Sequence, residues 1–163
     1  GKAVLLRSES GDPVHYDPEL AHSFLVALQS TQRVFETHLA ALTGEFSQIQ
    51  VWPHNFDMSV EWFGTKMIPY DEKGTTTLLP AQLNLGFYPG ENNDDSYFYS
   101  NPWPFEAEQL LGQSLPAGAE WHTDGWLGTE LPYDVVRKRP NSEQYLLDYA
   151  TAVYAIAQPT LLA

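Results

Sequence analysis

The stretch VWPHNFDMSVEWFG, residues 51–64, decides how the middle of the chain folds, because its apolar and polar residues alternate. Successive side chains of a strand point to opposite faces of a sheet. From Trp52 the even positions are apolar or aromatic except for His54, whereas the odd positions from Asn55 to Glu61 are polar. The alternation predicts a half-buried strand in which His54 points inward and the carboxylates of Asp57 and Glu61 point outward to solvent.

Pro53 interrupts this pattern. Before it the apolar residues are Ile49 and Val51, so the parity reverses and a bulge or kink is expected near the proline. His54 and Asp57 then point to opposite faces, which disfavours a metal pair or an oriented general base. The favoured interpretation is a buried histidine that is hydrogen-bonded to a backbone carbonyl.

Four further β-like runs follow this first one, which extends over 47–63. They are separated by connectors rich in Gly, Pro, Asn and Asp, as is typical of antiparallel sheets (YDEKGT, PGENNDD and GQSLPAG). PFEAEQLLG, residues 104–112, gives at most two helical turns, so parallel crossovers are not expected. The later runs are 78–88, 96–101, 118–123 and 126–131.

Two amphipathic helices bracket these strands. Residues 17–44 form the first, with Asp17 as the N-cap and Gly44 as the left-handed exit. Residues 141–158 form the second, with a capping box at its start and Pro159 as its stop. An α+β fold follows, in which a curved antiparallel sheet of about five strands packs against two long helices.

Composition narrows the class of protein. The 163 residues suit a single domain after an irregular lead-in over 1–16, and 43% hydrophobic residues suit a soluble globular core. Eight basic and 21 acidic residues give a net charge of −13, which makes nucleic acid and membrane surfaces poor partners. The basic cluster at 137–139 is interpreted as a solvated connection. Cysteine is absent, which leaves the redox compartment open.

The start of the chain leads to two further expectations, one about the location of the protein and one about the extent of the chain. No charged and then apolar leader opens it, so a cytoplasmic location is the default expectation. The first residue is Gly1 rather than methionine, which suggests a fragment of a longer protein.

EWHTDGW, residues 120–126, offers the best metal hypothesis. Glu120, His122 and Asp124 would share one face of a regular strand, with neighbouring Cβ atoms roughly 7 Å apart. Two of the three side chains could reach one cation. The competing interpretation is an ordinary solvated strand face opposite Trp121. Elsewhere the chain has no recognised catalytic or phosphate-binding motif, so no catalytic residue and no cofactor is predicted.

Aromatic residues are concentrated in the middle of the chain. Fourteen of the 22 lie between Trp52 and Trp126. One face of the sheet buries rings against the helices, and rings on the other face suit a ligand site, a partner interface or a second core layer. The candidate ligand-binding residues are Trp52, His54, Tyr97, Tyr99, Trp103, Trp121 and His122.

Several stretches resemble, in order, a bacterial family known as domain of unknown function 5996, which has a Trp-Pro-x-x-Phe-Asp signature. They are YDPELAHSFLVALQSTQRVFETH, VWPHNFDMSVEWFG, NLGFYPGE, YFYSNPW and GTELPYDVV, and they extend from about Tyr16 to Tyr154. The resemblance implies that this chain is the C-terminal half of a member. It also implies that position 54 varies in residue type, and it supplies no activity.

The sequence therefore leaves three candidate functions. The leading one is a non-catalytic domain that binds a small ligand or a partner through aromatic residues of the sheet, with sugar-like or heteroaromatic ligands as candidates. The second is a metal-assisted hydrolase that uses Glu120, His122 and Asp124. The third is a structural half that packs on an upstream domain or forms a homodimer.

Overall fold

The computed structural model describes residues 17–90 and 95–163, and the predicted lead-in over 1–16 lies outside the described residues. The helices in these ranges are α1 (Pro18–Ala40), α2 (Ala107–Leu110), α3 (Tyr133–Arg137) and α4 (Ser142–Leu161). The strands are β1 (Glu45–Phe46), β2 (Gln50–Val51), β3 (Met58–Glu72), β4 (Thr75–Tyr88), β5 (Tyr97–Trp103), β6 (Glu120–His122) and β7 (Gly128–Pro132).

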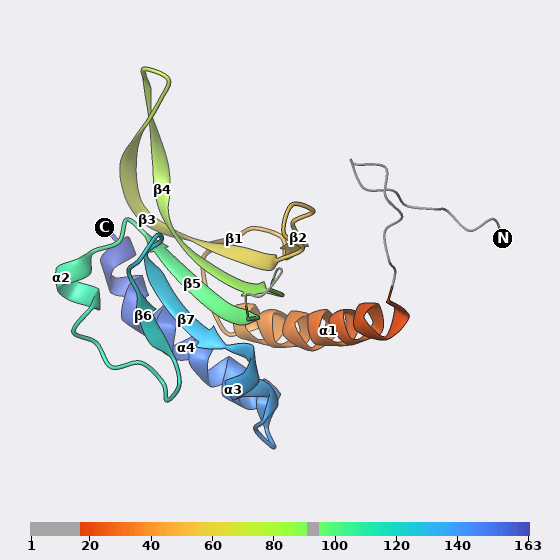
Figure 1. The fold of residues 1–163 in the computed structure, drawn as a ribbon. Coiled ribbons are helices and arrows are strands. Elements are labelled where there is room, and N and C mark those ends of the chain that lie inside the picture. Colours follow the sequence, from red (N-terminus) through yellow and green to blue (C-terminus); the bar gives the residue numbers. More distant parts are fainter. Residues whose placement is uncertain (1–16, 91–94) are drawn as a thin grey trace, which may run out of the picture.

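The strands form one antiparallel sheet in the order β1-β3-β4-β5-β7-β6, with β2 paired to the start of β3 (Figure 1). This confirms the predicted α+β class and the antiparallel sheet. The sheet has seven strands rather than about five in the described residues, because the chain from Glu45 to Glu72 supplies three of them. Of the three predicted connectors, YDEKGT contains the turn between β3 and β4, GQSLPAG joins α2 to β6 instead of two strands, and residues 91–94 of PGENNDD lie outside the described residues.

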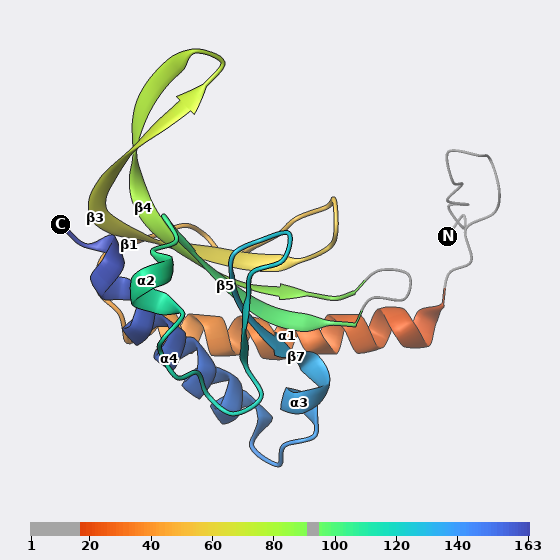
Figure 2. The same ribbon diagram turned by 60° about the vertical axis from the view of Figure 1, so that its left-hand side comes forward.

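The two faces of the sheet have different surroundings. Helices α1 and α4 lie against one face, and the opposite face is left open by both helices (Figures 1 and 2). The covered face carries the core residues Met58, Val60, Trp62, Leu83, Leu85, Phe87, Phe98 and Leu131. We call the other side the open face, and its register positions include Ser59, Glu61, Asn84, Gly86, Tyr97, Tyr99, Asn101 and Glu130.

The helix α1 begins as predicted but ends earlier. The Asp17 carboxylate accepts hydrogen bonds from the backbone N–H groups of Glu19 (2.9 Å) and Leu20 (3.1 Å), which confirms the cap. The helix stops at Ala40 with Ala41 as its C-cap, so the prediction that Gly44 ends it was wrong. Gly44 has a positive φ of 119°, and it turns the chain toward β1 after the helix has already ended.

Two predictions at the C-terminal end were also wrong, and one short helix was not predicted. The Asn141 side chain makes no capping hydrogen bond, so no capping box forms there. Pro159 lies inside α4, which continues to Leu161 because Thr160 and Leu161 are buried in the core. The short helix α3 was not predicted, and it follows β7 directly.

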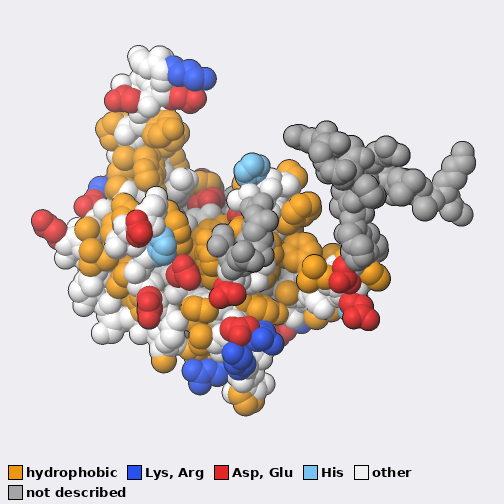
Figure 3. All heavy atoms as spheres, in the orientation of Figure 1, with side chains coloured by type: hydrophobic (Ala, Val, Ile, Leu, Met, Phe, Trp, Pro, Cys, Tyr) orange, Lys and Arg blue, Asp and Glu red, His pale blue; other side chains and the backbone are white. Residues whose placement is uncertain are grey.

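The outer ends of β3 and β4 form a two-stranded arm that projects beyond the rest of the sheet (Figures 1 and 2). Lys73 and Gly74, both with positive φ, make its tight turn. Apolar side chains gather along the arm below a charged tip (Figure 3), and its exposed ones are Met67, Tyr70, Leu78 and Leu79. That the chain packs on an upstream domain or forms a homodimer stays a prediction.

The helices within residues 17–90 and 95–163 are all too short or too polar to span a membrane.

Candidate functional site

Residues 52–57 form a tight loop between β2 and β3, and the regular strand begins only at Met58. The loop is closed by two backbone hydrogen bonds of 2.8 Å, from the Trp52 N–H to the Asp57 carbonyl and from the Phe56 N–H to the Trp52 carbonyl. Phe56 has a positive φ of 57°, which the closed loop imposes on it. Strand parity therefore holds from Met58 to Phe63 and fails before Met58, and a register shift follows between Phe63 and Met67.

This loop overturns the predicted position of His54. The imidazole is exposed on the loop rather than buried among the aromatic rings. The physical reason is that alternation of faces requires extended backbone, which residues 52–57 do not have. Phe56 is also largely exposed, although its ring meets Phe24 of α1 edge-on at 6.4 Å between centroids. The irregular backbone predicted near Pro53 is confirmed, but it is a loop over residues 52–57 and not a bulge or kink within a strand.

The same loop brings Asp57 to the open face, where the Tyr99 hydroxyl donates a 2.7 Å hydrogen bond to its carboxylate. Asp57 is half-buried, so the prediction that it points out to solvent was wrong. Burial raises the pKa of Tyr99 well above its usual value, and the hydrogen bond to Asp57 raises it further. Tyr99 is thus a neutral phenol that donates a hydrogen bond.

A glycine beneath the Tyr99 ring makes this arrangement possible. Ser59, Gly86, Tyr99 and Glu130 are paired across β3, β4, β5 and β7, so all four lie on the open face. A Cβ atom at Gly86 would stand 2.2 Å from Cζ of Tyr99. The absence of a side chain at this position therefore lets the ring lie flat over β4.

Gly128 has the corresponding role beneath Trp126. A Cβ atom there would lie 2.8 Å from Cζ3 of the indole and 2.3 Å from the carbonyl oxygen of Ser100. His122 stacks on the same indole, with ring centroids 4.1 Å apart, and its Nδ1 lies 3.0 Å from the Trp126 carbonyl oxygen. The turn after β6 is thereby folded back over the sheet, which places Trp126 beside the β5 tyrosines.

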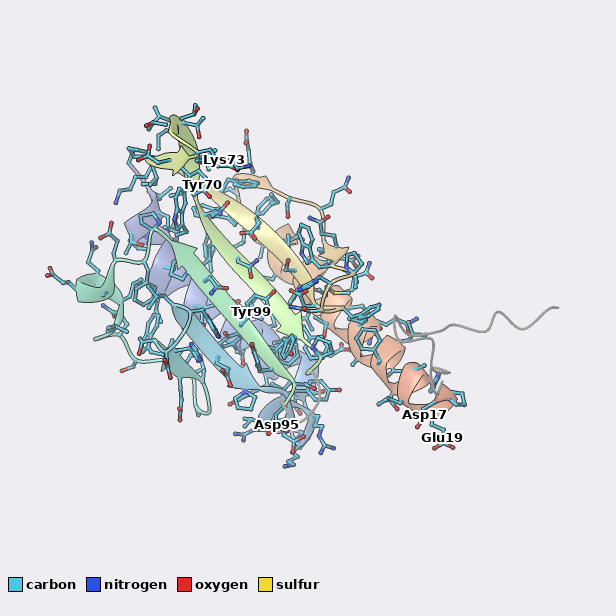
Figure 4. All side chains as sticks on the ribbon, turned by 45° about the horizontal axis from the view of Figure 1, so that its top comes forward. Asp17, Glu19, Tyr70, Lys73, Asp95 and Tyr99 are labelled. Carbon is cyan, nitrogen blue, oxygen red and sulfur yellow. The ribbon has the colours of Figure 1, made fainter. Side chains whose placement is uncertain are left out.

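These rings surround a cavity of about 570 Å³ on the open face. Figure 4 shows Tyr99 in the middle of this face and Asp95 at one end of the strands. Four aromatic side chains, three carboxylates and two amides line the cavity: Tyr88, Tyr97, Tyr99, Trp126, Asp57, Asp95, Glu130, Asn55 and Asn101.

A second polar pair, Glu61 and Asn84, lies in the next register row of the open face. The Asn84 amide donates a 2.6 Å hydrogen bond to one oxygen of Glu61. Oε2 of Glu61 and Oδ1 of Asn84 are buried and find no hydrogen-bond partner in the part of the chain that the structure describes. Burial raises the pKa of Glu61, and the hydrogen bond from Asn84 partly offsets this. The prediction that Glu61 faces open solvent was therefore wrong.

Only some of the seven predicted ligand-binding residues lie at the cavity. Tyr97 and Tyr99 line the cavity, and His122 stacks behind its Trp126 wall. The Trp52 indole donates a 2.8 Å hydrogen bond to the Ser59 hydroxyl next to Tyr99, without lining the cavity itself. His54, Trp103 and Trp121 also do not line it.

Trp103 and Trp121 have other contacts. Trp103 meets Tyr70 of the arm edge-on at 6.2 Å between centroids. Trp121 packs against Phe105 on the covered side of the sheet, and its indole N–H donates to the Gln113 carbonyl oxygen at 3.1 Å. Trp121 therefore belongs to the core that α2 and α4 complete.

The predicted metal ligands do not assemble. β6 ends at His122, and Gly125 with a φ of 84° turns the chain, so Asp124 lies in the turn rather than on the strand. Over residues 17–90 and 95–163, no three histidine or acidic side chains are grouped closely enough to hold a metal ion. Glu120, His122 and Asp124 thus form no preformed metal site in this structure.

Asp57, Glu130, Asn101 and Trp126 were not predicted as site residues. Strand register, the loop before β3 and the turn after β6 bring them together, and the only local signals are the glycines in NLGFY and GWLGTE. A glycine inside a strand indicates close approach of another group. Its partner, however, depends on the register of a different strand.

An antiparallel sheet that is backed by two helices and carries an aromatic, acidic cavity on its open face defines the architecture. The chain belongs to the Family of unknown function (DUF5996), which it matches over residues 7–161. This confirms the family resemblance drawn from the sequence. No match to the chain was found among the curated proteins or the solved structures.

Proposed function

We propose that this protein is a binding domain that holds a small organic molecule in the cavity of the open face. The observation that carries the proposal is the aromatic-walled space of about 570 Å³ around Tyr97, Tyr99 and Trp126. Its volume falls within the usual range of small-molecule sites, roughly 300–1,000 Å³, and its lining combines aromatic rings with carboxylate and amide groups.

The construction of the walls supports binding by stacking. Gly86 and Gly128 let Tyr99 and Trp126 lie close over the sheet backbone. The hydrogen bond from Tyr99 to Asp57 and the stack of His122 on Trp126 fix two of the rings before any ligand arrives. A ligand that meets preorganised rings loses less conformational entropy of the protein on binding.

The protonation state of Tyr99 favours binding over acid–base chemistry. Burial and Asp57 hold its hydroxyl in the neutral form, so it serves as a hydrogen-bond donor and not as a base near neutral pH. The alternative of a metal-assisted hydrolase at Glu120, His122 and Asp124 gains no support from the side-chain positions.

Amide-correlation NMR tests the proposal with three probes that share one phenol ring: tyramine, tyrosol and para-hydroxyphenylacetate. At least one probe is expected to bind in the millimolar range or better, with the largest shifts at the Tyr99 and Asn101 amides and the Trp126 indole N–H. Tyr97→Ala should weaken that binding about tenfold.

Tyr70→Ala is the matched control, because Tyr70 is a tyrosine of the same sheet that lies on the arm and outside the cavity (Figure 4). It should leave the affinity within about twofold. If no probe binds, or if the shifts map to the arm, the proposed function is wrong.

A further inference from the structure

We infer that the cavity selects a small organic cation, that is, a ligand whose aromatic or alkyl body carries an ammonium group. This inference rests on the proposed function and names the class of ligand. It follows from the charge, the ring geometry and the hydrogen-bonding groups of the cavity.

Negative charge in the cavity is uncompensated. Asp57, Asp95 and Glu130 line it, whereas no lysine, arginine or histidine is among its lining residues. None of these three carboxylates has an ion-pair partner among residues 17–90 and 95–163. Carboxylates gathered in a hollow with low-dielectric walls concentrate a negative potential that attracts cations and repels anions. The net charge of −13 adds to that potential.

The rings offer π faces in two orientations. Tyr97 and Trp126 are nearly parallel, at an interplanar angle of 12°, with centroids 6.3 Å apart. Tyr99 stands at 68° to Tyr97 and at 71° to Trp126. Aromatic walls set at steep angles are how proteins hold ammonium groups, since each ring presents the negative part of its quadrupole to the cation.

The carboxylates of Asp57, Asp95 and Glu130 give the cavity a set of hydrogen-bond acceptors. One N–H of the Asn101 side chain donates to the Leu127 carbonyl oxygen at 3.1 Å, which leaves its amide oxygen and its second N–H for a ligand. The Tyr99 hydroxyl already donates to Asp57. An alkylammonium group has donors and no acceptor, which matches such a lining.

Glu61 and Asn84 add further hydrogen-bond acceptors along the open face. Asn84 is paired in register with the cavity residue Asn101, and Glu61 is paired with Asn84. Each presents a buried acceptor oxygen that lacks a donor within the described ranges. Buried acceptors without donors are costly, so a ligand or water that supplies N–H or O–H groups is favoured beside them.

A charge series tests the inference by isothermal titration calorimetry on the full chain. Tyramine, tyrosol and para-hydroxyphenylacetate share a ring and are positive, neutral and negative; choline and its neutral isostere dimethylbutanol form a second pair. We expect at least one cation to bind about tenfold or more tighter than its neutral partner. Para-hydroxyphenylacetate should show no measurable binding.

Two variants locate the charge selectivity. Asp57→Asn and Glu130→Gln should each weaken binding of the preferred cation by about fivefold and binding of its neutral partner by much less. Glu72→Gln, an exposed carboxylate on the arm, is the matched control and should change neither. Thermal unfolding of each variant checks that the fold persists.

The outcomes separate the two proposals. If a neutral compound binds as tightly as its cation in both pairs, or if the two cavity variants weaken cation and neutral binding alike, the cation inference is overturned and the proposed function stands. If none of the five compounds binds, both fail.

Discussion

Gly86 shows how one residue without a side chain determines the shape of the cavity. The Tyr99 ring occupies the volume that any side chain at position 86 would need. The residue is required for this close approach rather than for an unusual backbone conformation, because its φ is not in the left-handed region. The cavity is therefore sensitive to a change as small as one methyl group.

Gly86→Ala is expected to displace Tyr99 and to lower the free energy of unfolding by about 1–3 kcal/mol, because the added methyl overlaps the ring. Urea unfolding followed by circular dichroism measures the change, and probe binding should weaken in parallel. Gly112→Ala is the matched control, since nothing lies within 4 Å of its Cβ position. Adding Gly86→Ala to Tyr99→Ala should cost much less, and an equal cost there would contradict the steric explanation.

At the scale of elements, the contact between α4 and β7 holds the open face in register above the helices. Tyr149 of α4 is fully buried, and its hydroxyl lies 2.8 Å from the Thr129 hydroxyl of β7. Burial raises the pKa of Tyr149, which keeps the phenol neutral. On its other side β7 carries Gly128 and Glu130, so this hydrogen bond helps to position two residues of the site.

Tyr149→Phe is expected to lower the free energy of unfolding by about 1–2 kcal/mol, because it leaves the buried Thr129 hydroxyl without this partner. Thr129→Val should cost a similar amount. The double variant should cost less than the sum of the two, with a coupling of about 1 kcal/mol in a thermodynamic cycle from chemical denaturation. Strict additivity would show that the hydrogen bond contributes nothing to stability.

At the scale of the whole molecule, His38 makes folding depend on pH. It lies on α1 between the helices and the sheet, with its ring edge-on to Tyr154 of α4 at 5.9 Å between centroids. Burial lowers its pKa from 6.5 to about 4. The side chain is only 5% exposed.

The sign of the pH effect follows from linkage. Between pH 6.5 and pH 4 the unfolded chain binds a proton at His38 that the folded chain resists, so stability falls as pH falls through this window. At pH 4 this proton binding by the unfolded chain lowers the free energy of unfolding by about 3 kcal/mol. Urea titrations at pH 7, 5.5 and 4 should show a shallower loss for His38→Gln than for the unaltered chain. The exposed His22, changed to Gln, is the control; parallel curves for all three proteins would contradict this origin.

Local patterns were sufficient for most of the elements. The helix start at Asp17, the antiparallel strands and the alternation from Met58 to Trp62 all follow from short-range preferences and side-chain periodicity. Local patterns failed where tertiary packing decides the backbone conformation. α4 continues through Pro159 because the residues after it are buried, and residues 52–57 alternate in polarity although they form a loop.

The site was predicted only in part for a related reason. Tyr97 and Tyr99 could be predicted because they alternate along one strand and so share its face. Their neighbours Asp57, Glu130 and Trp126 come from a loop, another strand and a turn, and strand register together with the close approach permitted by Gly86 and Gly128 decides their positions. The sequence by itself determined the fold class, the acidic charge and the richness in aromatic residues. Only the tertiary structure decided that these rings and carboxylates surround one cavity, because register is a relation between segments distant in the chain.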